Sequence, residues 1–243
     1  QWDRALAEFR DLKAQAEKGG DEYSLMATNW ILVFVHLDRH EYDDAERSIE
    51  AAVGLNAKRN PARPSMTGTM SAILRARLEI ARGRPEAALE KLKASEALYA
   101  DLDPAAREGF SFPWMSTMTE AELAAGRVED AIAAGGKLVL RILPGMTISA
   151  IANYNTPFLK DVLARAYWKK GELDRAAAEY RKLLTIDPAN QARGWMSPLY
   201  HYRLGRVLEE KGDGDGARAE YGKFLEYWKD ADPSHPELAD ARR

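Results

Sequence analysis

Two histidines lie four positions apart, at His36 and His40, a spacing that places both imidazoles on one face of a helix. Zinc proteases use such a pair, with a glutamate directly after the first histidine as the general base. In the sequence HLDRH that position holds leucine instead. His40 also falls in a predicted turn. We therefore expect structural roles for both histidines and no metal site.

Other stretches that could carry chemistry lack a necessary partner. Asp213 and Asp215 look like the start of a calcium loop, but Ala217 stands at the third ligand position, which favours a turn. His201 and His235 show no accompanying serine and aspartate constellation. The glycine pair 135–136 lacks the Lys-Ser or Lys-Thr of a phosphate loop. The sequence thus predicts neither an enzyme nor a cofactor.

A repeated phrase positions these residues. Its copies begin at His40, Gly83, Gly126, Gly171 and Gly212, spaced 43, 43, 45 and 41 residues apart, and each has alanine five positions later. A glycine in the first position can adopt a left-handed conformation and close one helix, and acids after it suit the start of the next. The alanine lets two helices approach closely. The phrase therefore predicts stacked helical hairpins.

The period and the motif content favour different repeat families. The period alone favours HEAT-type units of about 40 to 47 residues over tetratricopeptide units of about 34. The motif favours the second, because one segment resembles the tetratricopeptide pattern through Leu163, Ala164, Tyr167, Gly171, Ala176, Tyr180 and Pro188. The segment from Leu204 to Phe224 resembles it almost as well. The resemblance implies an all-α superhelix of helical hairpins.

The remaining copies depart from the pattern at known positions. Ala76 keeps its small residue, Val33 and Thr119 replace it, and Gly135 stands where an aromatic is expected. Longer helices or linkers must absorb the extra residues.

The signals together predict a single solenoid domain over residues 1–243. A partial N-terminal unit at 2–18 precedes about five hairpins, and a capping helix begins at Ser234. The hairpins are expected at 22–39 with 42–58, 65–82 with 85–99, 113–125 with 128–143, 157–170 with 173–185, and 198–211 with 215–229. Both ends interrupt a repeat, so we expect an excised segment of a longer protein or a processed mature chain.

Composition excludes several classes of function. The net charge of −3 gives no field for nucleic acid, and no window approaches the roughly 20 apolar residues of a membrane span. Without cysteine there are no disulfides and no thiolate metal sites. No signal peptide is visible, so we expect a cytoplasmic chain, whereas a signal peptide removed before Gln1 would place it in the periplasm.

The tetratricopeptide resemblance implies a concave groove lined by the first helix of each hairpin. Carried over position by position, it assigns to this groove Trp30, Phe34, Ile73, Arg77, Ser116, Glu120, Asp161, Arg165, Trp168, Lys169, Tyr202 and Arg206. Aromatic residues interleaved with arginines are typical of binding hot spots. The apolar members could equally pack between neighbouring hairpins. The lysine and asparagine set with which some family members bind a chaperone's acidic tail is absent from these positions.

Two classes of function follow. The favoured one is a protein-interaction scaffold that takes a peptide or partner segment in the groove. Because residues 200–238 resemble the repeat tails of bacterial kinases and winged-helix activators, this scaffold would belong to a multidomain bacterial regulator. The alternative is a carrier or sensor of an apolar small molecule, with a pocket lined by Phe112, Trp114, Met115 and Met118.

Overall fold

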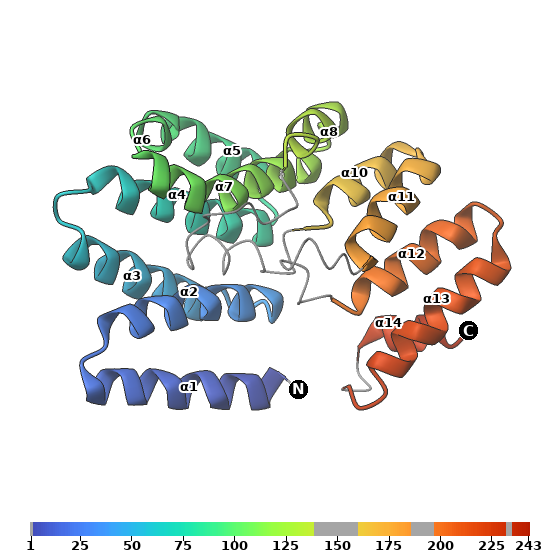
Figure 1. The fold of residues 1–243 in the computed structure, drawn as a ribbon, viewed down its shortest axis with the longest axis horizontal. Helices are drawn as coiled ribbons and strands as arrows, with labels where there is room; N and C mark the ends of the chain where they lie inside the picture. The colour runs from blue at the N-terminus through green and yellow to red at the C-terminus, as the bar shows by residue number, and fades with distance from the viewer. Residues whose placement is uncertain (1, 139–159, 186–196, 232–234) are drawn as a thin grey trace. The chain divides into compact units, whose positions relative to one another are not determined.

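The computed structural model describes residues 2–138, 160–185, 197–231 and 235–243. Within these ranges every regular element is a helix, which confirms the predicted all-α fold class (Figure 1). Contacts between residues divide the chain into two compact units, Gln1–Thr117 (unit 1) and Met118–Arg243 (unit 2). The single domain over residues 1–243 stays a prediction. No helix in the described ranges is long and apolar enough to cross a membrane.

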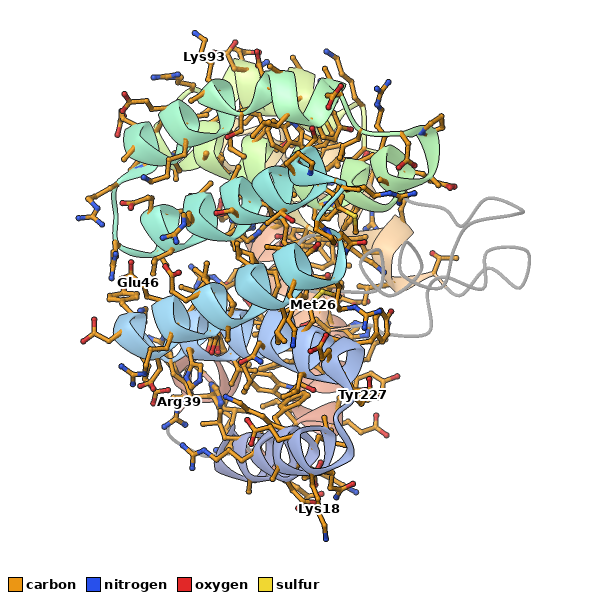
Figure 2. All side chains as sticks on the ribbon, turned by 90° about the vertical axis from the view of Figure 1, so that its left-hand side faces the viewer. Lys18, Met26, Arg39, Glu46, Lys93 and Tyr227 are labelled. Atoms are coloured by element: carbon orange, nitrogen blue, oxygen red, sulfur yellow. The ribbon has the colours of Figure 1, made fainter. Side chains whose placement is uncertain are left out.

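Unit 1 is a succession of helices that pack on their neighbours in sequence. It contains α1 (Trp2–Gly19), α2 (Glu22–Asp38), α3 (Tyr42–Arg59), α4 (Pro64–Ala81), α5 (Pro85–Ala94), α6 (Glu96–Ala100) and the first part of α7 (Pro104–Ala124). Each helix from α1 to α4 contacts the next, and α5 and α6 both contact α4 (Figure 1). Lys18 and Lys93 project outward at opposite ends of this stack (Figure 2).

Unit 2 continues the same arrangement. After the end of α7 come α8 (Val128–Gly135), α10 (Val162–Lys170), α11 (Leu173–Leu184), α12 (Leu199–Glu210), α13 (Gly214–Tyr227) and α14 (Pro236–Ala241). Each helix from α8 to α14 contacts the next (Figure 1). Its main core is built from α10 to α13 around Tyr180 and Tyr200, which are fully buried.

The repeated phrase has the two roles predicted from its residue types. The leading glycines adopt the left-handed conformation, with φ of 72° at Gly83, 78° at Gly126, 82° at Gly171 and 81° at Gly212. Each alanine five positions later is buried, at 0 to 4% exposure: Ala45, Ala88, Ala131, Ala176 and Ala217. The phrase therefore marks both the turn and the closest approach of each hairpin.

Thr119 and Gly135 of the α7–α8 hairpin both depart from the repeat pattern, and the two departures compensate each other in size. In the last hairpin a Cβ on Gly205 would lie 2.6 Å from Cε1 of Tyr221, so the small residue is on the first helix and the large one on the second. In the α7–α8 hairpin the order is reversed, because a Cβ on Gly135 would lie 3.1 Å from Cγ2 of Thr119. In these two hairpins one residue at this contact is therefore glycine, on either helix.

Helix boundaries differ from the prediction in several places. The helix expected over 128–143 ends at Gly135, with 136–138 outside it, and the helix expected from 157 begins at Val162. We expected a helix to begin at Pro113, but α7 begins at Pro104 and carries Pro113 inside it. The true start has the same kind of signal, since the Asp103 carboxylate accepts a hydrogen bond from the Ala106 amide at 3.0 Å. The helix predicted over 85–99 divides at Ser95 into α5 and α6. The predicted helical residues 139–143 and 157–159, and Ser234, lie outside the described residues.

Replacing His40 with glycine is expected to raise the free energy of unfolding by about 1 kcal/mol, because a left-handed conformation costs a residue with a Cβ roughly 1 to 2 kcal/mol. His40 has a φ of 59° and occupies the turn position that glycine holds in the other four hairpins. Its hydrogen bond with the Tyr42 hydroxyl, at 3.0 Å, offsets part of the gain. Urea denaturation measures the change. His40→Ala is the control, because it keeps the strained backbone and should give no stabilisation.

Candidate partner-binding groove

The stretches with possible metal chemistry have structural roles. The Asp213 carboxylate caps α13 by accepting a hydrogen bond from the Gly216 amide at 2.9 Å, which confirms the predicted turn. His36 and His40 do not converge, since Nδ1 of His36 contacts Glu41 at 2.8 Å whereas His40 contacts Tyr42.

One group in the described ranges, His36, Glu41 and Asp44, has ligand atoms close enough to hold a cation. Glu41 also accepts from Arg39 at 2.8 Å, and Asp44 pairs with Arg47. Hydrogen bonds from His36 and Arg39 lower the pKa of the Glu41 carboxyl. Because arginines already neutralise both carboxylates, the group is explained as a set of ion pairs at the start of α3.

In unit 1 most of the predicted groove residues are buried. Ile73 is 0% exposed, Phe34 7% and Arg77 9%. The Arg77 guanidinium lies over the Phe34 ring at 5.6 Å and donates to the Thr117 hydroxyl at 2.9 Å. Trp30 is half-buried, with its ring 6.1 Å from that of Phe34. These side chains therefore hold unit 1 together and offer little surface to a partner.

The neighbouring predicted residue Ser116 is also 0% exposed, and its hydroxyl donates to the Pro113 carbonyl at 3.2 Å. It too belongs to the interior of unit 1.

In unit 2 four predicted residues come together around one hollow between α7 and α10. Its volume is about 400 Å³, and it is lined by Glu120, Leu123, Ala124, Arg165, Trp168 and Lys169. We call it the α7–α10 hollow. The sequence prediction missed Leu123 and Ala124. They lie three and four positions after Glu120, one helical turn along the same face, and that spacing could have identified them.

The most polar wall of the hollow is an ion network. Nη1 of Arg165 donates to Oε1 of Glu120 at 2.8 Å, and Nη2 contacts the other carboxylate oxygen. Nε of Arg165 donates to Asp161 at 3.2 Å. Asp161 is 1% exposed and is also bound by Arg203, and the Tyr180 hydroxyl donates to it at 3.4 Å.

The network is held in its charged state. Burial disfavours the Asp161 carboxylate, but Arg165 and Arg203 outweigh that cost and lower its pKa below the ordinary value. Burial also disfavours the Arg165 cation, yet Asp161 and Glu120 raise its pKa. Two acids and two arginines cancel in charge. Arg165 is therefore a fixed wall of the hollow, because its cation is already neutralised, and Asp161 lies behind it and out of reach.

Trp168 and Lys169 present the chemistry that a partner could use. The Trp168 indole is half-buried and held in place by a hydrogen bond from Nε1 to Glu210 at 2.8 Å. Lys169 is exposed, and its ammonium donates to the Leu123 carbonyl at 3.1 Å. Among the described residues Lys169 pairs with no carboxylate. An ammonium has three donors, so two remain for a ligand.

The last two predicted residues, Tyr202 and Arg206, are joined by the C-terminal helix. The Tyr202 hydroxyl donates to the Asp240 carboxylate at 2.7 Å, and Nη1 of Arg206 contacts the same oxygen at 3.1 Å. The hydroxyl also accepts from Arg206 at 3.2 Å. An acid of α14 thus already occupies this section of the groove.

The residues of the alternative pocket are largely interior. Phe112 and Trp114 are 8% and 4% exposed, and the Trp114 ring stacks on Tyr99 at 4.7 Å. Met115 and Met118 are half-buried. This placement favours packing for the two aromatic side chains, and the small-molecule function stays a prediction.

Comparison with known proteins identifies the repeat. The sequence model described as tetratricopeptide repeat matches residues 161–190, which include α10 and α11. This chain contains a tetratricopeptide repeat. The resemblance stated from the sequence is thereby confirmed, although the match covers one repeat only. No curated protein sequence matches the chain.

One solved structure extends the likeness to the fold of most of the chain. The crystal structure of a point variant of the nearly identical TPR-like repeats of a Podosopora anserina putative kinesin light chain is 19% identical, with a TM-score of 0.51, over 84% of this chain and 94% of that chain. A second crystal structure of those repeats is also 19% identical, covers 86% of this chain and 97% of that one, and has a TM-score of 0.49. The tetratricopeptide fold indicates, in general terms, a scaffold for protein interactions.

Proposed function

We propose that this tetratricopeptide-repeat chain is a protein-interaction scaffold whose unit 2 binds an extended partner segment along α7 and α10. The α7–α10 hollow takes an apolar side chain of that segment, and Lys169 pairs with a carboxylate beside it. The observation that carries the proposal is the composition of the hollow. Two consecutive first helices bring together there an indole and an ammonium that pairs with no carboxylate within the described ranges.

The charge expected on the partner follows from which cations at the hollow already have a carboxylate partner. Glu120 neutralises Arg165, so a carboxylate would gain little there. Lys169 has two ammonium donors left, and a partner carboxylate would form a charge-assisted hydrogen bond with it. Leu123, Ala124 and the face of Trp168 supply the apolar surface. Because Glu210 fixes the indole, its orientation costs little entropy on binding.

The proposed scaffold has no catalytic role, since tetratricopeptide folds typically serve as non-enzymatic scaffolds. The expectation that it forms part of a bacterial regulator rests on residues 200–238 alone. Its location in the cytoplasm or periplasm likewise stays a prediction. A protein partner, rather than nucleic acid, agrees with the net charge of −3.

Lys169→Glu is expected to weaken binding of the partner segment at least about tenfold, since it replaces an attraction with a repulsion at the edge of the hollow. Peptides selected from a random display library on the parent chain supply the ligands, and fluorescence anisotropy gives their affinities.

The matched control is Lys170→Glu, the same charge reversal on the next residue. Lys170 pairs with Glu129 and Glu172 and does not line the hollow, so its variant should bind as the parent does. Arg165→Glu is a poor substitute, because it would break the contacts with Glu120 and Asp161. If both lysine variants keep the parent's affinity while remaining folded, the hollow is not the binding site.

A further inference from the structure

The C-terminal helix α14 supplies the only acid, among the described residues, that bridges Tyr202 and Arg206 in the groove of the last hairpin. It spans six residues, Pro236–Ala241, and packs on α13. Leu238 is 1% exposed, and Asp240, two positions later, binds both Tyr202 and Arg206. An aliphatic anchor followed by an acid thus occupies a face that the repeat pattern assigns to partners.

The preceding repeat shows that Asp240 takes the place of an acid on the neighbouring first helix. Glu120, Arg165 and Arg206 are equivalent, each six positions before the turn glycine of its hairpin. Arg165 receives its carboxylate from Glu120 on the preceding first helix. Arg206 has Arg165 at the preceding equivalent position, which offers a cation and no acid. Glu209 of its own helix lies 3.7 Å from Nε of Arg206, and Asp240 of α14 supplies a closer carboxylate from the other side, at 3.1 Å from Nη1.

We propose that α14 is an exchangeable internal ligand of the last groove section, and that this section binds a partner helix with an aliphatic residue two positions before an acid. The proposal rests on the function proposed above and adds a second ligand position to it. In the closed chain α14 blocks this position, and a partner of the same chemistry displaces it.

The contacts of α14 allow such an exchange. Its polar contacts are partly open to solvent, with the Arg206 side chain 37% exposed and the Asp240 side chain 21% exposed. Helices shorter than about 12 residues are marginal in water, so α14 depends on docking for its structure. Undocking it would leave the interior of the α12–α13 hairpin in place, because Leu204, Val207, Leu208 and Ala217 are buried within the main core of unit 2. Local opening of this kind requires far less free energy than global unfolding.

A labelled peptide with the chain's own residues 231–243 tests the exchange in trans. Its affinity is measured for the parent chain and for the double variant Leu238→Ser, Asp240→Asn, in which the internal ligand is weakened. The variant should bind the peptide at least about tenfold more tightly, because the tethered α14 competes at high effective concentration in the parent. Adding Arg206→Ala to the variant should abolish binding, as should Asp240→Asn within the peptide.

Equal affinity of the parent and the double variant would overturn the proposal. The single variant Asp240→Asn, which keeps Leu238, gives the same comparison with a smaller increase if the double variant does not fold. Hydrogen exchange on the parent is an independent measurement: the amides of α14 should exchange at least about tenfold faster than those of α13. Equal exchange rates would mean a fixed cap. Adding Lys169→Glu to the double variant should leave peptide affinity unchanged, which separates this result from the test of the hollow.

Discussion

Replacing Asp161 with asparagine is expected to lower the free energy of unfolding of unit 2 by about 3 to 5 kcal/mol, because it removes the acid from a buried ion network. The side chain is 1% exposed and lies between Arg165 and Arg203. Asparagine keeps the shape and leaves the arginines with one carboxylate, that of Glu120. Urea denaturation at neutral pH measures the loss.

The control for this change is Asp174→Asn, which removes an acid whose side chain is 90% exposed and paired with Lys211. That variant should remain close to the parent, because exposed ion pairs contribute little. An Asp161→Asn chain as stable as Asp174→Asn would show that the network does not hold α7, α10 and α12 together.

The stability difference between the parent and Asp161→Asn is expected to depend on pH. The folded chain lowers the pKa of Asp161, so the carboxylate contributes stability above its unfolded pKa of about 3.9. This contribution is lost as the pH falls from there through the lowered folded pKa. The parent's advantage in free energy of unfolding over Asp161→Asn should therefore become smaller at acidic pH. If this advantage became larger at acidic pH, folding would raise the pKa of Asp161, contrary to the lowering described here.

Replacing Ala176 with leucine is expected to lower the free energy of unfolding by about 1 to 3 kcal/mol, because the larger side chain overpacks a close contact. Ala176 is 0% exposed and lies in the core of α10 to α13. Ala178→Leu is the matched control, since Ala178 is exposed on the same helix. Two variants of equal stability would mean that the alanine of the repeated phrase does not mark a helix approach.

The hairpins were predictable because their signals are local. The first residue of the phrase reports a left-handed turn and the alanine five positions later reports close packing, and both features hold at each of the five copies. Helix boundaries were less predictable where two signals compete. Pro104 and Pro113 can each begin a helix, and the capping carboxylate of Asp103 favours the first.

The groove was predictable in position and less so in chemistry. The pattern placed Glu120, Arg165, Trp168 and Lys169 on one face, and they line one hollow. It could not indicate that Glu120 neutralises Arg165, because that contact joins residues 45 positions apart. Nor could it show that Asp240 binds Arg206, across 34 positions. These pairings depend on how hairpins stack, which a single-repeat pattern does not contain.

The same limit explains unit 1. Phe34, Ile73 and Arg77 occupy the positions that the family uses for a groove, yet all three are buried. Arg77 contacts Phe34 and Thr117, which come from other helices. A pattern of residue types cannot distinguish an exposed arginine from one that is covered by neighbouring hairpins.

Photo-crosslinking from the hollow tests the central claim most directly. A photoreactive residue replaces Ala124, which lines the hollow and is exposed, or Ala178, which is exposed on the second helix α11 and does not line it. Each chain is irradiated in an extract of the source organism, and mass spectrometry maps the crosslinked partner peptide. Binding in the hollow predicts a defined peptide with an apolar residue beside an acid, captured from position 124 and absent from 178. Capture of the same peptide from position 178, with none from 124, would contradict it.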